Sequence, residues 1–150
     1  MRPYLDKVIP EAWKAAGVFS NTIRTEALQR GLTPEESDLV KVRASQMNGC
    51  AFCLNLHTEE ARDAGVPQQK LDLLPAWREV ALFTERDRAV LAIAEAATAL
   101  PITEEASADL AGARHVLGDD AFVAAEWVAA AINAFNRISI LSQHPVRERK

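Results

Sequence analysis

The sequence has no apolar stretch long enough to cross a membrane. Its most apolar segment, residues 121–135, is interrupted by Glu126 and is shorter than the roughly 20 residues that a transmembrane helix needs. The first seven residues also lack the apolar core of a signal peptide. We therefore expect no membrane association and a cytoplasmic location.

An excess of positive charge is also missing. Seventeen Lys and Arg residues against twenty-one Asp and Glu residues give a formal net charge of −4. No basic stripe with interleaved aromatic residues is present, and residues 147–150 form a small basic cluster typical of a solvated chain end. No nucleic acid is expected among the partners.

Patterns typical of β-strands are rare. No stretch alternates apolar and polar residues for long, runs of β-branched residues are few, and alanine is abundant. The 49% of apolar residues is enough for a real hydrophobic core in a chain of 150 residues. The sequence predicts an all-α fold in a single domain, residues 1–150.

Residues typical of helix ends divide the chain. Thr33, Pro34 and Glu36 have the spacing of an N-cap, a first helical residue and the end of a capping box. Asn48 is expected to cap the following helix and to place Cys50 in its first turn. The expected helices cover residues 3–30 (one or two helices), 34–47, a segment from Asn48 to about Ala64, 85–100, 103–118 and 119–143.

The chain has only two cysteines, and they lie close together. Cys50 and Cys53 are followed by His57, and on a helix these three side chains fall within an arc of roughly 60°. In a reducing compartment, such a pair is typical of catalysis or metal binding rather than of a structural disulfide. Two thiols with a base one turn further on suit reversible dithiol–disulfide chemistry.

Two physical arguments select different nucleophiles. Cys50 in the first turn of a helix has its thiolate favoured by free N–H groups and the helix dipole. Cys53 lies four residues before His57, whose imidazole can take its proton. From these arguments alone the choice stays open.

A catalytic histidine also needs a group that fixes its tautomer. Asp38 lies twelve residues before Cys50, and a helix break at residues 48–49 can fold its helix back toward His57. Glu35 and Glu36 compete for this role, but the capping box occupies Glu36. Asp38 is therefore the predicted partner of His57.

Other readings of the same residues exist. Cys50, Cys53, His57 and Asp38 could supply four zinc ligands, although three of them come from one helical segment and no second Cys/His pair is present. The cysteines could also be small buried apolar residues, or form a disulfide that alters a subunit contact in a redox sensor or partner-binding module without catalysis. We predict no metal and no cofactor.

Several polar residues lie outside this motif. His144 precedes Pro145 and is expected to be exposed, and a structural role at a helix end is expected for His115. Three polar residues in an otherwise apolar helix could bond across a subunit interface or line the site: Asn133, Asn136 and Arg137.

The cysteine motif resembles that of a known family. Residues 38–65 contain Ser-Gln-x-Asn-Gly followed by Cys-x-x-Cys-x-x-x-His, and this pattern is similar to the alkylhydroperoxidase D-like (AhpD-like) branch of the carboxymuconolactone decarboxylase family. Segments 77–79, 83–88 and 132–137 look like the same group. The resemblance covers about residues 33–140, with the core motif region at 33–65.

The resemblance implies a function as well as a fold. It implies an AhpD-like helical bundle that assembles as homo-oligomers, often trimers or hexamers, and a thiol-dependent peroxidase that reduces organic hydroperoxides or hydrogen peroxide. Cys53 would attack the peroxide and become a sulfenic acid, and Cys50 would resolve it to a disulfide. His57 would relay the proton with the help of Asp38. A dithiol donor, a thioredoxin-like or lipoyl protein, would reduce the disulfide.

The chain departs from the family pattern at two positions. Asp38 stands where the pattern has a glutamate, which is one methylene longer. Phe52 stands where it has a histidine directly before the second cysteine, so the predicted pocket is more apolar. The decarboxylase branch generally lacks the cysteine pair, so that activity fits the chain poorly.

Overall fold

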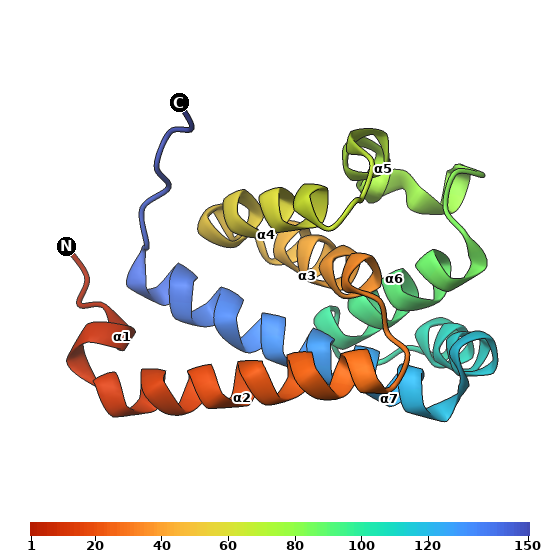
Figure 1. Ribbon diagram of the computed structural model, residues 1–150, viewed down its shortest axis with the longest axis horizontal. Coiled ribbons are helices and arrows are strands. Elements are labelled where there is room, and N and C mark those ends of the chain that lie inside the picture. The colour runs from red at the N-terminus through yellow and green to blue at the C-terminus, as the bar shows by residue number, and fades with distance from the viewer.

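A computed structural model describes all 150 residues and contains helices but no β-strand (Figure 1). The all-α prediction is confirmed. The helices are α1 (Leu5–Val8), α2 (Pro10–Gln29), α3 (Pro34–Asn48), α4 (Ala51–Asp63), α5 (Gln68–Leu73), a short 3₁₀ helix η1 (Leu74–Glu79), α6 (Glu85–Thr98) and α7 (Glu104–Ser142).

Capping boxes open both α3 and α6. The Thr33 hydroxyl accepts the N–H of Glu36 at 3.2 Å, and the Glu36 carboxylate accepts the N–H of Thr33 at 3.0 Å. Thr84 and Asp87 make the same reciprocal pair at the start of α6. Each box satisfies two backbone N–H groups that a helix start leaves without partners.

The junction between α3 and α4 differs from the prediction. Asn48 is the last residue of α3 and does not cap α4. Gly49 ends α3 with a left-handed φ of 64°, a conformation that glycine adopts without a steric penalty. The chain is therefore extended only at Cys50, which becomes the N-cap of α4 instead of a first-turn residue.

Helix α7 bends where the sequence predicts a break. Gly118 has φ 75° and ψ 163°, far from helical values, and separates the segment before it from the long final segment. The two helices predicted to meet at this glycine are thus present as the two arms of α7, which Figure 1 shows turning back at this point.

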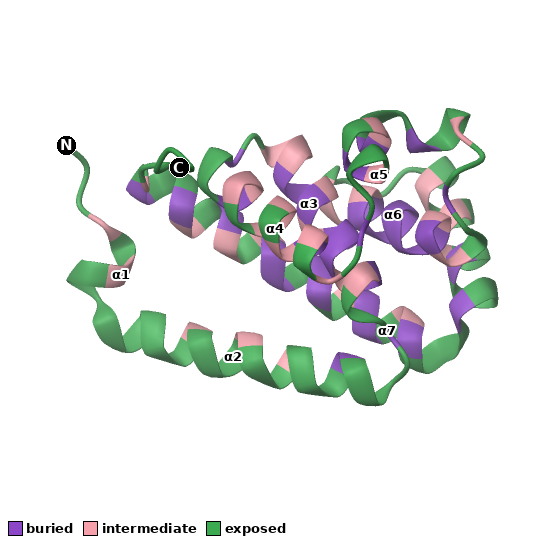
Figure 2. Cartoon of the chain, turned by 45° about the horizontal axis from the view of Figure 1, so that its top comes forward, coloured by how far each residue is buried: buried purple, intermediate pink, exposed green.

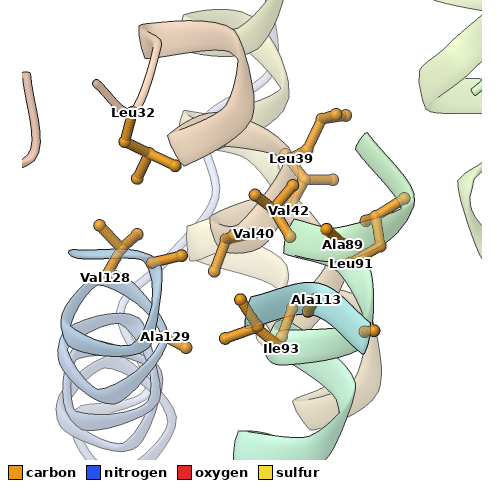
Figure 3. Close-up of a cluster of buried hydrophobic side chains, with 14 of the residues drawn as sticks. Leu32, Leu39, Val40, Val42, Ala89, Leu91, Ile93, Ala113, Val128 and Ala129 are labelled. Atoms are coloured by element: carbon orange, nitrogen blue, oxygen red, sulfur yellow. The ribbon is translucent and has the colours of Figure 1, made fainter. Parts of the chain in front are cut away.

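The hydrophobic core lies between α3, α6 and the second arm of α7. It is a continuous cluster of 24 buried residues, and α6 packs against both other helices. Figure 3 shows branched side chains of α3, such as Val40 and Val42, facing Leu91 and Ile93 of α6. This core fixes α3 and α7, which carry much of the site described below.

Helix α2 contributes only Ala27 to that core. Ala27 is its only buried residue, and Figure 2 shows the helix exposed along nearly its whole length. The helix packs beside α7, with Trp13 and Phe19 in edge contacts with rings of α7, while Val18 and Leu28 are exposed. None of the helices combines the length and the apolar character that a membrane-spanning segment requires.

The two chain ends meet at the same end of the bundle (Figure 1). The prediction that His144 is exposed is wrong, since only 13% of its side chain is exposed. Its Nε2 atom lies 2.9 Å from the Asp6 carboxylate and its Nδ1 atom 3.2 Å from the Ser139 hydroxyl. The Tyr4 ring also makes an edge contact with the imidazole of His144. Residues of the N-terminal segment therefore cover His144, which follows the end of the last helix.

Candidate active site

The two cysteines form a disulfide at the start of α4. Their Cα atoms are 5.3 Å apart, and Cys50 and Cys53 are only 2% and 3% exposed. The N–H of Cys53 donates to the Cys50 sulfur at 3.4 Å. A thiolate at Cys50 would therefore have an N–H donor and the positive end of the helix dipole beside it.

A buried polar network holds the turn that carries the cysteines. Asn136 of α7 is fully buried, donates to the Ser45 hydroxyl at 3.0 Å and accepts from the Asn48 side chain at 2.9 Å. Asn48 also donates to Asn133 at 2.9 Å. Two of the polar residues in the final helix thus bond within the chain, to the end of α3.

Glu60 is the hydrogen-bond partner of His57. The Nδ1 atom of His57 lies 2.8 Å from a Glu60 carboxylate oxygen, one turn along α4. Because an ionised carboxylate can only accept, Nδ1 carries the proton and a neutral imidazole has its lone pair on Nε2. This hydrogen bond holds the pKa of Glu60 below its usual value, against the opposing effect of burial.

Asp38 makes no hydrogen bond with His57. Its carboxylate is 3.7 Å from the Lys41 ammonium, and the residue is 7% exposed on α3. Burial raises the pKa of Asp38, and the nearby charges of Lys41 and His57 only partly offset this. The contact predicted from the sequence is thus taken by Glu60, while Asp38 lies nearby as a carboxyl group with an elevated pKa.

Cys53, His57, Glu60 and Asp38 line one groove of about 560 Å³. The groove is lined by residues of α2, α3, α4 and the second arm of α7. Figures 1 and 2 label these helices among the others. Half of its lining is apolar. Cys50 is not among the lining residues, so of the two cysteines only Cys53 borders the groove.

Phe52 also lines this groove and is partly exposed. Its ring lies 5.3 Å from the imidazole of His144, measured between centroids. The apolar surroundings predicted from Phe52 are present, and the groove continues over Leu56, Ile132 and Phe135.

No group of three or more His, Cys, Asp or Glu side chains is arranged to hold a metal ion. The two sulfurs are bonded to each other, and the Nδ1 atom of His57 is occupied by Glu60. The arrangement therefore suits thiol redox chemistry better than the tetrahedral ligand set of a zinc site.

Comparison with known proteins identifies the family. The sequence profile of the carboxymuconolactone decarboxylase family matches residues 15–96, more than half of the chain. The chain belongs to this family. The uncharacterised protein YdfG of Bacillus subtilis is 33% identical over 112 residues, which are 75% of this chain and 76% of YdfG. The uncharacterised YnjA of Escherichia coli is 33% identical over 72 residues, 48% of this chain and 40% of YnjA.

A solved structure supports the AhpD-like branch of the carboxymuconolactone decarboxylase family. The crystal structure of ATU0492 from Agrobacterium tumefaciens superimposes with a TM-score of 0.84 and 33% sequence identity. The match covers 97% of this chain and 99% of that one. ATU0492 is described as a protein of unknown function and a candidate antioxidant defence protein AhpD.

Sequence reasoning missed Glu60 and the groove. The spacing of three residues between His57 and Glu60 places them on neighbouring turns of a helix, and this signal was available. The groove had no such signal in the sequence. One of its walls is formed by α2, and only the tertiary fold brings α2 opposite α4.

Proposed function

We propose that this protein is a thiol-dependent peroxidase that reduces organic hydroperoxides or hydrogen peroxide through Cys50 and Cys53. The observation that carries this proposal is that Cys53, one half of the disulfide, lines the same groove as His57. The family and the likeness to a candidate antioxidant protein support the same chemistry.

The reaction begins with the reduced pair. The Cys53 thiolate attacks the terminal oxygen of the hydroperoxide, forming an S–O bond and breaking the O–O bond. Cys53 becomes a sulfenic acid, and the alkoxide takes a proton to leave as an alcohol. Cys50 then gives up its proton and its thiolate attacks the Cys53 sulfur, so that the S–S bond forms and the S–O bond breaks, and the hydroxide leaves as water with that proton.

Acid–base groups of the groove serve these steps. His57, oriented by Glu60, presents Nε2 as the base that takes the proton of Cys53. His57 then gives this proton to the alkoxide, and Asp38, whose pKa burial raises, lines the groove beside this relay. Cys50, stabilised as a thiolate at its helix start, is a good resolving nucleophile and a good leaving group when the disulfide is reduced.

A dithiol protein, of the thioredoxin-like or lipoyl type, completes the cycle. Its thiolate attacks Cys53, the cysteine that lines the groove, forming a mixed disulfide and expelling the Cys50 thiolate. The second thiol of the donor then attacks the mixed disulfide, so that the donor becomes a disulfide and Cys53 is released as a thiol. The reducing cytoplasm is the compartment we propose for this cycle, and a trimer or hexamer is the proposed assembly.

Steady-state turnover of cumene hydroperoxide with dithiothreitol as electron donor tests the proposal. Cys53→Ser should abolish turnover, because it removes the attacking sulfur. Cys50→Ser, reduced and then freed of dithiol, should react once and stop at a sulfenic acid that dimedone traps, because free dithiol would itself reduce the sulfenic acid. Full turnover by Cys53→Ser would contradict the assigned roles.

The alternative is a redox sensor without turnover. A sensor would form the same disulfide with peroxide but would show no saturable catalytic cycle when the dithiol is supplied in excess. Absence of turnover together with reversible disulfide formation would favour this reading over the peroxidase.

A further inference from the structure

We propose that the groove takes amphipathic hydroperoxides that carry an anionic group, such as fatty-acid hydroperoxides, and that Arg24 of α2 binds the anion. This inference rests on the proposed peroxidase function and specifies its substrate class. It follows from the shape of the groove, the polarity of its walls and the position of one unpaired cation.

The groove has the size and walls of a site for an elongated apolar molecule. Its volume of about 560 Å³ lies in the usual range for small-molecule sites. Trp13 of α2 packs edge-on against Phe135 of α7 with ring centroids 5.9 Å apart. Together with Phe52 and Leu56 of α4, these rings form an apolar wall beside Cys53.

Arg24 is the only basic side chain of the groove without an ionic partner. The other lysine or arginine in the lining, Lys41, is paired with Asp38 at 3.7 Å. Arg24 makes no hydrogen bond or ion pair, although its charge is close enough to lower the pKa values of Asp38 and Glu60. A guanidinium with free donors is suited to bind a carboxylate.

The acidic groups of the groove leave room for a ligand anion. Glu60 is tied to His57, and Lys41 offsets the charge of Asp38. Asp63, the remaining acidic residue in the lining, lies at the last turn of α4, ten residues beyond Cys53. The positive charge of Arg24 is therefore the one that no neighbouring side chain compensates directly.

The groove runs along α4, which favours an elongated molecule. Cys53 and Glu60 both line it and lie seven residues apart on this helix, or roughly 10 Å along its axis. Arg24 lines the same groove from α2. A fatty-acid hydroperoxide with its peroxide in mid-chain can place the carboxylate at Arg24 and the peroxide at Cys53.

Single-turnover oxidation by linoleic acid hydroperoxide and by its methyl ester tests this proposal. The wild-type protein should react faster with the acid by roughly fivefold, the value of one partly exposed ion pair. Arg24→Gln should remove this preference, so that the acid and the ester react at equal rates. Arg24→Lys should keep part of the preference for the acid. Arg30→Gln also removes one positive charge from α2, but outside the groove, and should keep the whole preference.

A binding measurement separates this proposal from the peroxidase itself. Calorimetric titration with decanoate and with 1-decanol involves no peroxide, and Arg24→Gln should weaken the binding of decanoate only. Turnover of acid and ester at equal rates in every variant would overturn the anion site and leave the peroxidase standing. Failure of all peroxides to react, with binding of decanoate that depends on Arg24, would overturn the peroxidase and leave the anion site. Absence of binding by both decanoate and 1-decanol would overturn the anion site. This result is expected if a second copy of the chain covers the groove.

Discussion

At the scale of single residues, the site pairs its histidine with a carboxylate on the same helix. The family pattern has a glutamate at the position of Asp38, and the shorter aspartate makes no hydrogen bond with His57 here. Glu60, one turn beyond His57, makes that contact at 2.8 Å. The two acidic residues thereby have different roles, because Glu60 orients the base and Asp38 only lines the groove beside it.

This division predicts the effect of Glu60→Gln. The glutamine lacks the charge that fixes the proton on Nδ1 of His57, so we expect the rate of sulfenic acid formation to fall on the order of tenfold. Stopped-flow oxidation of the reduced protein measures this rate. Glu59→Gln, at the exposed neighbouring position, should change it little, and equal losses in the two variants would contradict the role of Glu60.

At the scale of secondary structure elements, helix starts with a capping box are predictable, whereas the start of α4 and the contacts between helices are not. The capping box at Thr33 and Glu36 is a local pattern, and it appears as predicted. The hydrogen bonds between Asn136 and the end of α3 join residues 88 and 91 positions apart, and nothing local in the sequence indicates them. The spacing of Glu60 from His57 is a local signal, whereas the predicted partner, Asp38, makes no hydrogen bond with His57.

The asparagine network predicts a large effect of Asn136→Ala. Removing this buried amide leaves polar atoms of Ser45 and Asn48 without one of their partners, so the free energy of unfolding should fall by about 2 kcal/mol. Urea denaturation of the reduced protein measures it. Asn21→Ala, on the exposed face of α2, should change stability by less than about 0.5 kcal/mol. A similar small loss at Asn136 would show that the network does not stabilise the cysteine turn.

At the scale of the whole molecule, burial of the Asp38 carboxylate lowers the free energy of unfolding at neutral pH. The pKa of Asp38 is raised above its ordinary value of 3.8, so the folded protein holds this proton more tightly than the unfolded chain. The stability contributed by this group is therefore present below pH 3.8 and is lost as the pH rises through the folded-state pKa. At neutral pH the ionised carboxylate is a net cost to folding.

Asp38→Asn should therefore raise the melting temperature at pH 7 by a few degrees and lower the peroxidase rate. The gain in melting temperature should shrink as the pH falls through the folded-state pKa of Asp38 and vanish below 3.8, where the carboxyl group is neutral in both the folded and the unfolded chain. Thermal unfolding followed by circular dichroism across this pH range measures it. A lower melting temperature of the variant at pH 7 would mean that the pair with Lys41 outweighs the burial of Asp38.

The central claim is that Cys50 and Cys53 form a redox pair that a peroxide oxidises. Intact mass and free-thiol count of the reduced protein, before and after one equivalent of cumene hydroperoxide, test it most directly. We predict the loss of two hydrogens and of both thiols within seconds, reversed by a dithiol. Unchanged thiols, or a slow gain of oxygen without a disulfide, would contradict the account.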